Sequence, residues 1–386
     1  MRTRLVALCV SLSFVACGER GSVSPNHLPA GGATAGDSAG GSVASGGAAG
    51  AMTSGGSETG GSTQGGALSA GAGGMGGSGG SVNAGGAGGT AGAPQQSGSI
   101  CPPGPYAASP LPASPTIRTV CTGMKFTEGP VWLADQGKLF FSNFDDKDAA
   151  NAFPGGIMAY APGGTCEPFL DDAGTNGLGL MNDGRILAAR QVKHTVTLID
   201  VSTKQMTDLV SDYMGMALDS PNDVTARKDG NVYFTDPTWV PRPSPQALYR
   251  RAPNGTLTAL PYPNRHPNGI TLSADQQRLF LSLESPNEVV VFDVAADGSL
   301  SSPQQWAADS SDGMVIDCAG NVYFSCCGSV RVYSPQGALI GTLPVPDAVL
   351  PDPTNLAFGG PDRKTLYITG SSVLRAVDLN VPGYPF

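Results

Sequence analysis

Short apolar runs alternate with turn residues throughout the C-terminal two-thirds of the chain, and the pattern repeats six times. Each repeat opens with a polar lead residue and an apolar run, then passes through a turn to a second β-rich run. The leads and their runs are Glu128–Trp132, Asn176–Leu180, Asn222–Ala226, Asn268–Leu272, Asp312–Ile316 and Asn355–Phe358. The second runs are Lys138–Ser142, Arg185–Ala188, Asn231–Thr235, Arg278–Ser282, Asn321–Ser325 and Thr365–Thr369.

Successive leads lie 48, 46, 46, 44 and 43 residues apart. A period of about 40 to 50 residues is typical of the four-stranded blades of a propeller. The pattern therefore predicts an all-β fold, a six-bladed β-propeller over residues 100–386. We expect the segment 117–126 to pair beside the last strands, near residues 373–379, because this closes the ring and removes free edges.

A propeller places equivalent positions of its blades on one ring around the central channel. A ring of one Glu, one Asp and four Asn leads offers hard oxygen ligands, which suit calcium and do not suit zinc or copper. The alternative is that Asn and Asp start these strands only because they satisfy turn and bulge geometry. Six leads in register favour a metal site.

The first hundred residues predict export. Residues 1–17 resemble a lipoprotein signal peptide, with Arg2 and Arg4 before the apolar run 5–15. Phe14–Cys17 resembles a bacterial lipobox, although Phe14 stands where Leu is usual, and Cys17 is then the lipidated residue. We expect an exported protein of the bacterial cell envelope or surface that meets the membrane only through this lipid anchor.

Residues 18–99 are mostly Gly, Ala, Ser and Thr, a composition that cannot form a packed core. They are expected to act as a flexible tether with a root-mean-square span of roughly 50 Å. The charges of the first hundred residues cancel, so the domain carries the whole net charge of −9. This acidic balance argues against nucleic acid as a partner.

Six cysteines fall in the domain: Cys101, Cys121, Cys166, Cys318, Cys326 and Cys327. An even number in an exported domain favours disulfides, and six cysteines allow fifteen connectivities. Adjacent strand residues point to opposite faces, so Cys326 and Cys327 are expected to bond elsewhere unless they form a rare vicinal pair. His266, two residues before a lead, is expected at the channel mouth; no nucleophile elbow supports a Ser-His-Asp triad.

Several motifs resemble, in order, those of the SMP-30/gluconolactonase/regucalcin-like (LRE-like) family of six-bladed propellers. They are Phe126–Trp132, Ser220–Val224, Tyr233–Pro237, Pro267–Ile270, Asp312–Met314 and Thr354–Gly360. The resemblance spans about residues 117–378 and implies a divalent metal, most often calcium, held by Glu128, Asn268 and Asp312. Asn222 matches a fourth position that contacts metal or substrate.

The resemblance also implies hydrolysis of a sugar-type lactone, with Asp312 as the candidate general base. Asn176 matches a weaker substrate contact. Ser220 stands where animal regucalcins carry an Arg that touches the sugar, so the polar contacts to substrate can differ here. Trp239, together with His266, is a candidate substrate contact at the rim, whereas Trp132 is better explained by packing between strands.

Two other functions stay open at this stage. The propeller could be a non-catalytic binding or scaffold module at the surface. It could also hydrolyse a different ester, such as an organophosphate. The presence of both Glu128 and Asp312 favours an enzyme that acts on a small-molecule lactone, and the sequence leaves the oligomeric state undetermined.

Overall fold

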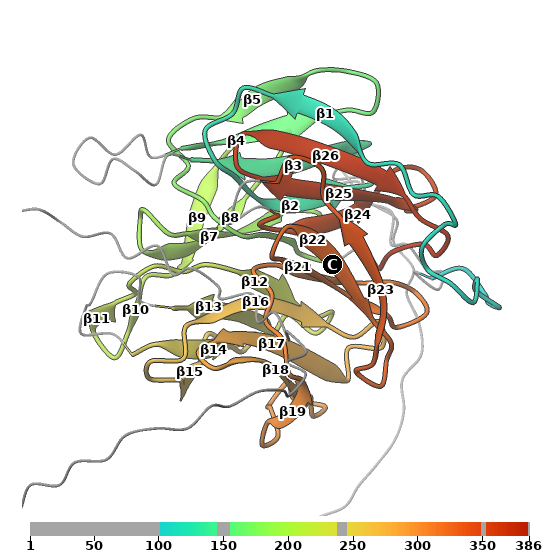
Figure 1. Cartoon of the computed structure of the whole chain (residues 1–386). Helices are drawn as coiled ribbons and strands as arrows, with labels where there is room; N and C mark the ends of the chain where they lie inside the picture. The colour runs from blue at the N-terminus through green and yellow to red at the C-terminus, as the bar shows by residue number, and fades with distance from the viewer. Residues whose placement is uncertain (1–100, 145–154, 238–244, 349–352, 385–386) are drawn as a thin grey trace, which may run out of the picture. The chain divides into compact units, whose positions relative to one another are not determined.

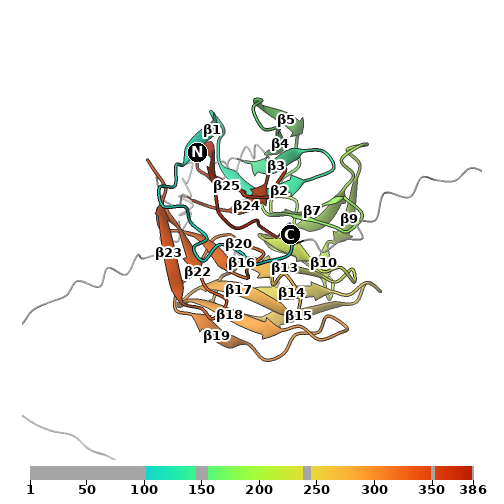
Figure 2. The same cartoon turned by 90° about the vertical axis from the view of Figure 1, so that its right-hand side faces the viewer.

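The structure is a computed structural model that describes residues 101–144, 155–237, 245–348 and 353–384. These residues form 26 β-strands and contain no helix, so they contain none long and apolar enough to cross a membrane. The strands make six four-stranded sheets and one small hairpin. Figures 1 and 2 show the six sheets arranged as blades around a central axis, which confirms the predicted six-bladed propeller.

In blades 1 to 5, the strands run in sequence order from the innermost to the outermost. Blade 1 has β2 (Thr127–Leu133), β3 (Lys138–Asn143), β4 (Gly156–Tyr160) and β5 (Cys166–Leu170). Blade 2 has β6 (Leu178–Leu180), β7 (Ile186–Arg190), β8 (Thr195–Ile199) and β9 (Met206–Val210). Blade 3 has β12 (Val224–Ala226), β13 (Val232–Asp236), β14 (Ala247–Arg251) and β15 (Leu257–Pro261).

Blade 4 has β16 (Pro267–Leu272), β17 (Arg278–Glu284), β18 (Asn287–Asp293) and β19 (Gln304–Ala307). Blade 5 has β20 (Met314–Ile316), β21 (Val322–Cys326), β22 (Ser329–Tyr333) and β23 (Leu339–Pro344). Blade 6 has β24 (Leu356–Gly359), β25 (Thr365–Gly370), β26 (Val373–Asp378) and, outermost, β1 (Arg118–Thr122). The hairpin of β10 (Asp212–Tyr213) and β11 (Met216–Ala217) connects blades 2 and 3.

The hydrophobic core is divided into six clusters, one between each pair of neighbouring blades. This follows from the alternation of side chains along each strand, because both faces of every blade meet another blade. Between blades 6 and 1, Trp132 stacks on Tyr367 with ring centroids 5.9 Å apart and an interplanar angle of 10°. Trp132 is therefore a packing residue, as expected.

The strand that closes the ring comes from the N-terminal side of the domain. β1 pairs antiparallel with β26, with Arg118 opposite Ala376 and Thr122 opposite Val373, as predicted. A disulfide joins Cys121 of β1 to Cys166 of β5, the outermost strand of blade 1, with the two Cα atoms 6.1 Å apart. The seam between the last and first blades is thus closed by strand pairing and by a covalent bridge.

The other cysteines form two further disulfides, Cys101–Cys318 and Cys326–Cys327. Of the two alternatives for Cys326 and Cys327, the structure has the rarer one, because they bond to each other as a vicinal pair. The rule of alternating faces does not apply to this pair. Cys327 lies in the turn after β21 and adopts a left-handed conformation with φ of 54°.

The two ends of the channel differ. We call the end at which the innermost strands begin the upper end, and the end at which they finish the lower end. The C-terminal segment covers the lower end, where the N–H of Tyr384 donates to the carbonyl of Ile316 at 2.9 Å and that of Cys318 to Pro382 at 2.8 Å. The Cys101–Cys318 disulfide fastens the beginning of the described chain at this same end.

Candidate active site

A β-bulge at the upper end of the innermost strand sets the position of each lead. In blade 5, the N–H of Asp312 donates to the carbonyl of Ser325 at 3.0 Å, and the N–H of Ser325 donates to the carbonyl of Gly313 at 3.1 Å. Two residues therefore oppose one, as in a bulge. The same pair of bonds occurs at Asn176 and Asn222, and the strand register shifts in the same place at Glu128 and Asn268.

The residue after most leads is glycine because the neighbouring blade approaches closely at this point. A Cβ atom on Gly269 would lie 2.5 Å from the carbonyl oxygen of Asp312, and one on Gly129 would lie 2.2 Å from that of Asn176. Real Cβ atoms do not approach backbone so closely, so only glycine fits. The lead-glycine pairs of the sequence repeat are thus explained by packing around the axis.

The lead of blade 6 is Thr354, and the prediction of Asn355 is wrong. The N–H of Thr354 donates to the carbonyl of Thr369 at 3.0 Å, and the N–H of Thr369 returns to the carbonyl of Asn355 at 3.0 Å. Asn355 therefore occupies the position that Asp223 occupies in blade 3, one residue below the ring. The ring contains three Asn leads rather than four. The sequence pattern matched residue type, whereas the register is set by backbone hydrogen bonds.

Asn268 connects the carboxyl groups of blades 4 and 5 (Asn268 of β16, Glu284 of β17 and Asp312 before β20). Its Nδ2 donates to Oδ1 of Asp312 at 2.9 Å and to Oε1 of Glu284 at 2.7 Å. Its Oδ1 is buried and has no hydrogen-bond partner among the described residues. A buried carbonyl oxygen without a donor costs free energy unless a ligand satisfies it.

Glu128 completes this group from blade 1. Its side chain is only 3% exposed, and its Oε2 accepts the N–H of Gly129 at 2.8 Å. The amide side chain of Asn355 lies near both Glu128 and Asp223 and partly offsets the rise in their pKa. Carboxyl groups from four blades therefore lie within electrostatic range of one another at the upper part of the channel.

Burial raises the pKa of all four carboxyl groups. It raises the pKa of Glu128 to about 8, with a further increase from the charge of Asp223, and the pKa of Asp223 to about 7. The pKa of Glu284 is raised for the same reason. Burial, followed by the charges of Glu128 and Glu284, raises the pKa of Asp312 well above its ordinary value. A divalent cation among these groups would favour their ionised forms.

The donor set fits a hard cation. Carboxylates of Glu128 and Asp312 and the unsatisfied amide oxygen of Asn268 are the ligand types that calcium takes. The described residues contain no group of three or more His, Cys, Asp or Glu side chains arranged to hold a metal. The donor set described above contains only two such side chains, Glu128 and Asp312, because its third member, Asn268, is an amide.

The remaining predicted substrate contacts are distributed over the upper end. Asn176 is buried, and its Nδ2 donates to Oε1 of Gln191 at 2.7 Å. Asn222 is the buried lead of blade 3. His266 lies directly before β16, with its Nδ1 3.5 Å from Nε2 of Gln246. Trp239 and Cys17 lie outside the described residues.

Sequence reasoning missed Glu284, Gln191 and Asp223. Glu284 ends the second strand of its blade and Gln191 directly follows that of its own, where nothing in the apolar period marks a functional side chain. They could have been found by their register, since each lies two residues beyond the residue opposite the lead. Asp223 takes the place of the usual glycine, which was a visible departure from the repeat.

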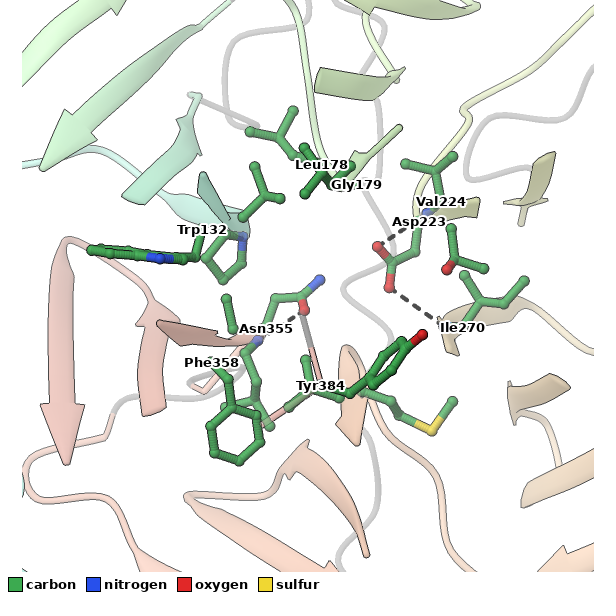
Figure 3. A pocket seen from close by; sticks show the side chains of 17 residues that line it. Trp132, Leu178, Gly179, Asp223, Val224, Ile270, Asn355, Phe358 and Tyr384 are labelled. Carbon is green, nitrogen blue, oxygen red and sulfur yellow. Dashed lines mark hydrogen bonds between the residues drawn. The ribbon is translucent and has the colours of Figure 1, made fainter. Parts of the chain in front are cut away.

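A small cavity of about 40 Å³ lies below the ring, lined by the innermost strands together with Asp223, Asn355 and Tyr384. Figure 3 shows the side chains of Asp223, Asn355 and Tyr384 around it. This volume holds about three water molecules and is far below the roughly 300 Å³ or more of a ligand pocket. The cavity below the ring is therefore too small to hold a sugar-sized ligand.

Comparison with known proteins agrees with this architecture. Residues 126–372 match the sequence profile of the SMP-30/gluconolactonase/LRE-like region. A gluconolactonase of Zymomonas mobilis is 28% identical over 275 residues, which cover 64% of this chain and 77% of that protein. A pentonolactonase of Haloferax volcanii is 26% identical over 267 residues, covering 65% and 84%.

A solved structure is similar as well. The gluconolactonase of Xanthomonas campestris has a TM-score of 0.61 and 26% identity, with 72% of this chain and 98% of that chain covered. The profile match extends over more than half of the chain and contains all six leads and the lead-glycine pairs. The chain therefore belongs to the SMP-30/gluconolactonase/LRE-like family.

Proposed function

We propose that this protein is a metal-dependent hydrolase of a sugar-type lactone and that its active site is the upper end of the channel. The observation that carries the proposal is the unsatisfied Oδ1 of Asn268 beside the Asp312 carboxyl group in a member of this family. The similarity to a gluconolactonase and a pentonolactonase supports a sugar lactone as the substrate class.

Glu128, Asn268 and Asp312 would hold the metal, with Asn222 as a fourth contact to metal or substrate. Calcium is the best candidate because all of these donors are oxygen atoms. The two carboxylates balance its charge, and the Asn ligands add none. A bound divalent cation would act as a Lewis acid that polarises the lactone carbonyl.

Asp312 is the proposed general base. Asn268 holds its Oδ1 at 2.9 Å, so Oδ2 is the oxygen that would take a proton from the attacking water. The water oxygen adds to the carbonyl carbon, the ring C–O bond breaks, and the ring oxygen receives the proton, which gives a hydroxy acid. Base catalysis of this kind contributes a factor of about 10² to 10⁴.

The neutral leads are the proposed contacts to the sugar hydroxyls. Asn176 is oriented by Gln191 at 2.7 Å, and Asn222 stands on the next blade. His266 and Trp239 are the proposed contacts at the rim. Amide side chains both donate and accept, which suits hydroxyl groups.

The direct test is proton release from a panel of aldonolactones by the full-length chain, with calcium and then with a chelator. We expect turnover that needs the metal, is strongest on one ring size, and is lost in Asp312→Asn. Calcium binding without turnover on any lactone would favour a binding module or a different ester.

We also propose that the protein is exported and anchored at Cys17 by a lipid. The three disulfides support an oxidising compartment, since such bonds are rare in the cytosol. Metabolic labelling with a radioactive fatty acid should mark the wild-type chain but not Cys17→Ser. Equal labelling of both chains, or labelling of neither, would contradict the anchor at Cys17.

A further inference from the structure

Two leads are held by a hydrogen bond to a side chain of their own blade. Gln191 accepts from Nδ2 of Asn176 at 2.7 Å in blade 2, and Glu284 accepts from Nδ2 of Asn268 at 2.7 Å in blade 4. Both occupy the same place, two residues beyond the residue that opposes the lead on the second strand. The two blades therefore share the same backbone arrangement, but the accepting side chain is the neutral Gln191 in blade 2 and the acidic Glu284 in blade 4.

The two hydrogen bonds of Asn268 fix the orientation of its amide group. An amide nitrogen has two hydrogens, and here one goes to Glu284 and the other to Asp312. Rotating the amide by 180° would place Oδ1 against two carboxyl oxygens. The amide oxygen is therefore held away from both carboxyl groups, where it is buried and has no donor among the described residues.

The backbone of Glu284 is itself fixed. Its N–H donates to the carbonyls of Arg265 and His266 at 3.0 and 3.3 Å, so the end of β17 is tied to the segment that leads into β16. Asn268 stands two residues beyond His266. Glu284 and Asn268 thus belong to one hydrogen-bonded unit at the upper end of blade 4.

We infer that Glu284 is a positioning residue that orients Asn268 toward the metal. The inference rests on the proposed metal site of Glu128, Asn268 and Asp312. Partners that orient metal ligands typically contribute about 10- to 100-fold to metal affinity. Gln191 makes the equivalent hydrogen bond to Asn176, which is not a proposed metal ligand. Gln191 is therefore a matched control for Glu284.

The test is calorimetric titration of calcium chloride into the full-length chain after removal of metal with EDTA. Four variants are compared with the wild type: Glu284→Met, Glu284→Ala, Glu284→Gln and Gln191→Ala. Met keeps the length of the side chain and removes the acceptor; Ala serves if Met does not fold. Gln keeps an acceptor, and the Gln191–Asn176 pair demonstrates that Gln can hold an Asn from this position.

We expect Glu284→Met to bind calcium about 10- to 100-fold more weakly than the wild type. Glu284→Gln should stay within a few-fold of the wild type, and Gln191→Ala should match it. Wild-type affinity in both Glu284→Met and Glu284→Ala would overturn the inference. Equal weakening in Gln191→Ala would overturn it too, because a general loosening of the upper end would then explain the loss. A wild type that binds no calcium would instead refute the metal site itself.

Discussion

The leads of the propeller fall into two sets that share one backbone frame and differ in charge. Glu128, Asn268 and Asp312 form the charged set, in which Asn268 is bonded to two carboxyl groups. Asn176, Asn222 and Thr354 form the neutral set, in which Asn176 is bonded to the amide of Gln191. The repeat therefore determines the position of each lead in the ring, whereas the blades that carry acids determine the chemistry of the ring.

The largest effect should come from replacing Asp312, the proposed general base of the charged set, by a neutral residue. Asp312→Asn should lower kcat by about 10² to 10⁴ at saturating calcium, because the proton acceptor is lost while the shape is kept. The measurement is proton release under substrate saturation. A comparable loss of kcat in Asn176→Ala would break the distinction between the two sets.

The charged set should also make the metal-free protein sensitive to pH. The pKa of Glu128 is raised to about 8 in the folded chain, so the folded state holds a proton that the unfolded state releases above its ordinary pKa. Stability from this group is therefore complete below about pH 4.5 and is lost as the pH rises toward 8. One pKa unit corresponds to about 1.4 kcal/mol, so several degrees in Tm are at stake.

Thermal melts in a chelator at pH 5 and pH 8 measure this effect against Glu128→Gln, which cannot ionise. We expect the wild type to lose more Tm than the variant between the two pH values. Calcium should restore more Tm at pH 8, since the ligands must be ionised to bind it. A wild type and variant with the same pH response would contradict the assigned burial of the Glu128 charge.

A smaller effect is expected in the neutral set. Asn176→Ala should raise KM by up to about tenfold, because one hydrogen bond to substrate is worth about 1 kcal/mol. Its kcat and calcium affinity should stay near those of the wild type, since Asn176 lies outside the charged set. Steady-state kinetics on the preferred lactone decide this, and an unchanged KM would remove Asn176 from the substrate contacts.

The smallest effect is expected at the vicinal disulfide of blade 5. Cys327 stands at the position that Glu284 occupies in blade 4, yet Asp312 is held by Asn268 from the neighbouring blade. The double variant Cys326→Ser with Cys327→Ser should therefore change kcat/KM by less than about tenfold, below the effect of losing a direct catalytic group. A loss as large as that of Asp312→Asn would show that this turn positions the base.

The period of the repeat was enough to predict the fold, including the closing strand β1, because each blade must bury both faces. The structure brings the predicted residues Glu128, Asn268 and Asp312 close together at the upper end, and their role as metal ligands stays a prediction. Thr354 was missed because backbone hydrogen bonds, and not residue type, define the lead. Glu284 was missed because its role depends on a neighbouring strand, which a linear pattern does not reveal.

The closed lower end has a practical consequence. Cys101 and Tyr384, the first and last described residues, are both fastened there. A fusion partner or a solid support joined near either residue would attach on the side opposite the leads. Immobilised in this way, the domain would present its ring of leads away from the support. The fold is therefore suited to display on a surface without loss of access for small molecules.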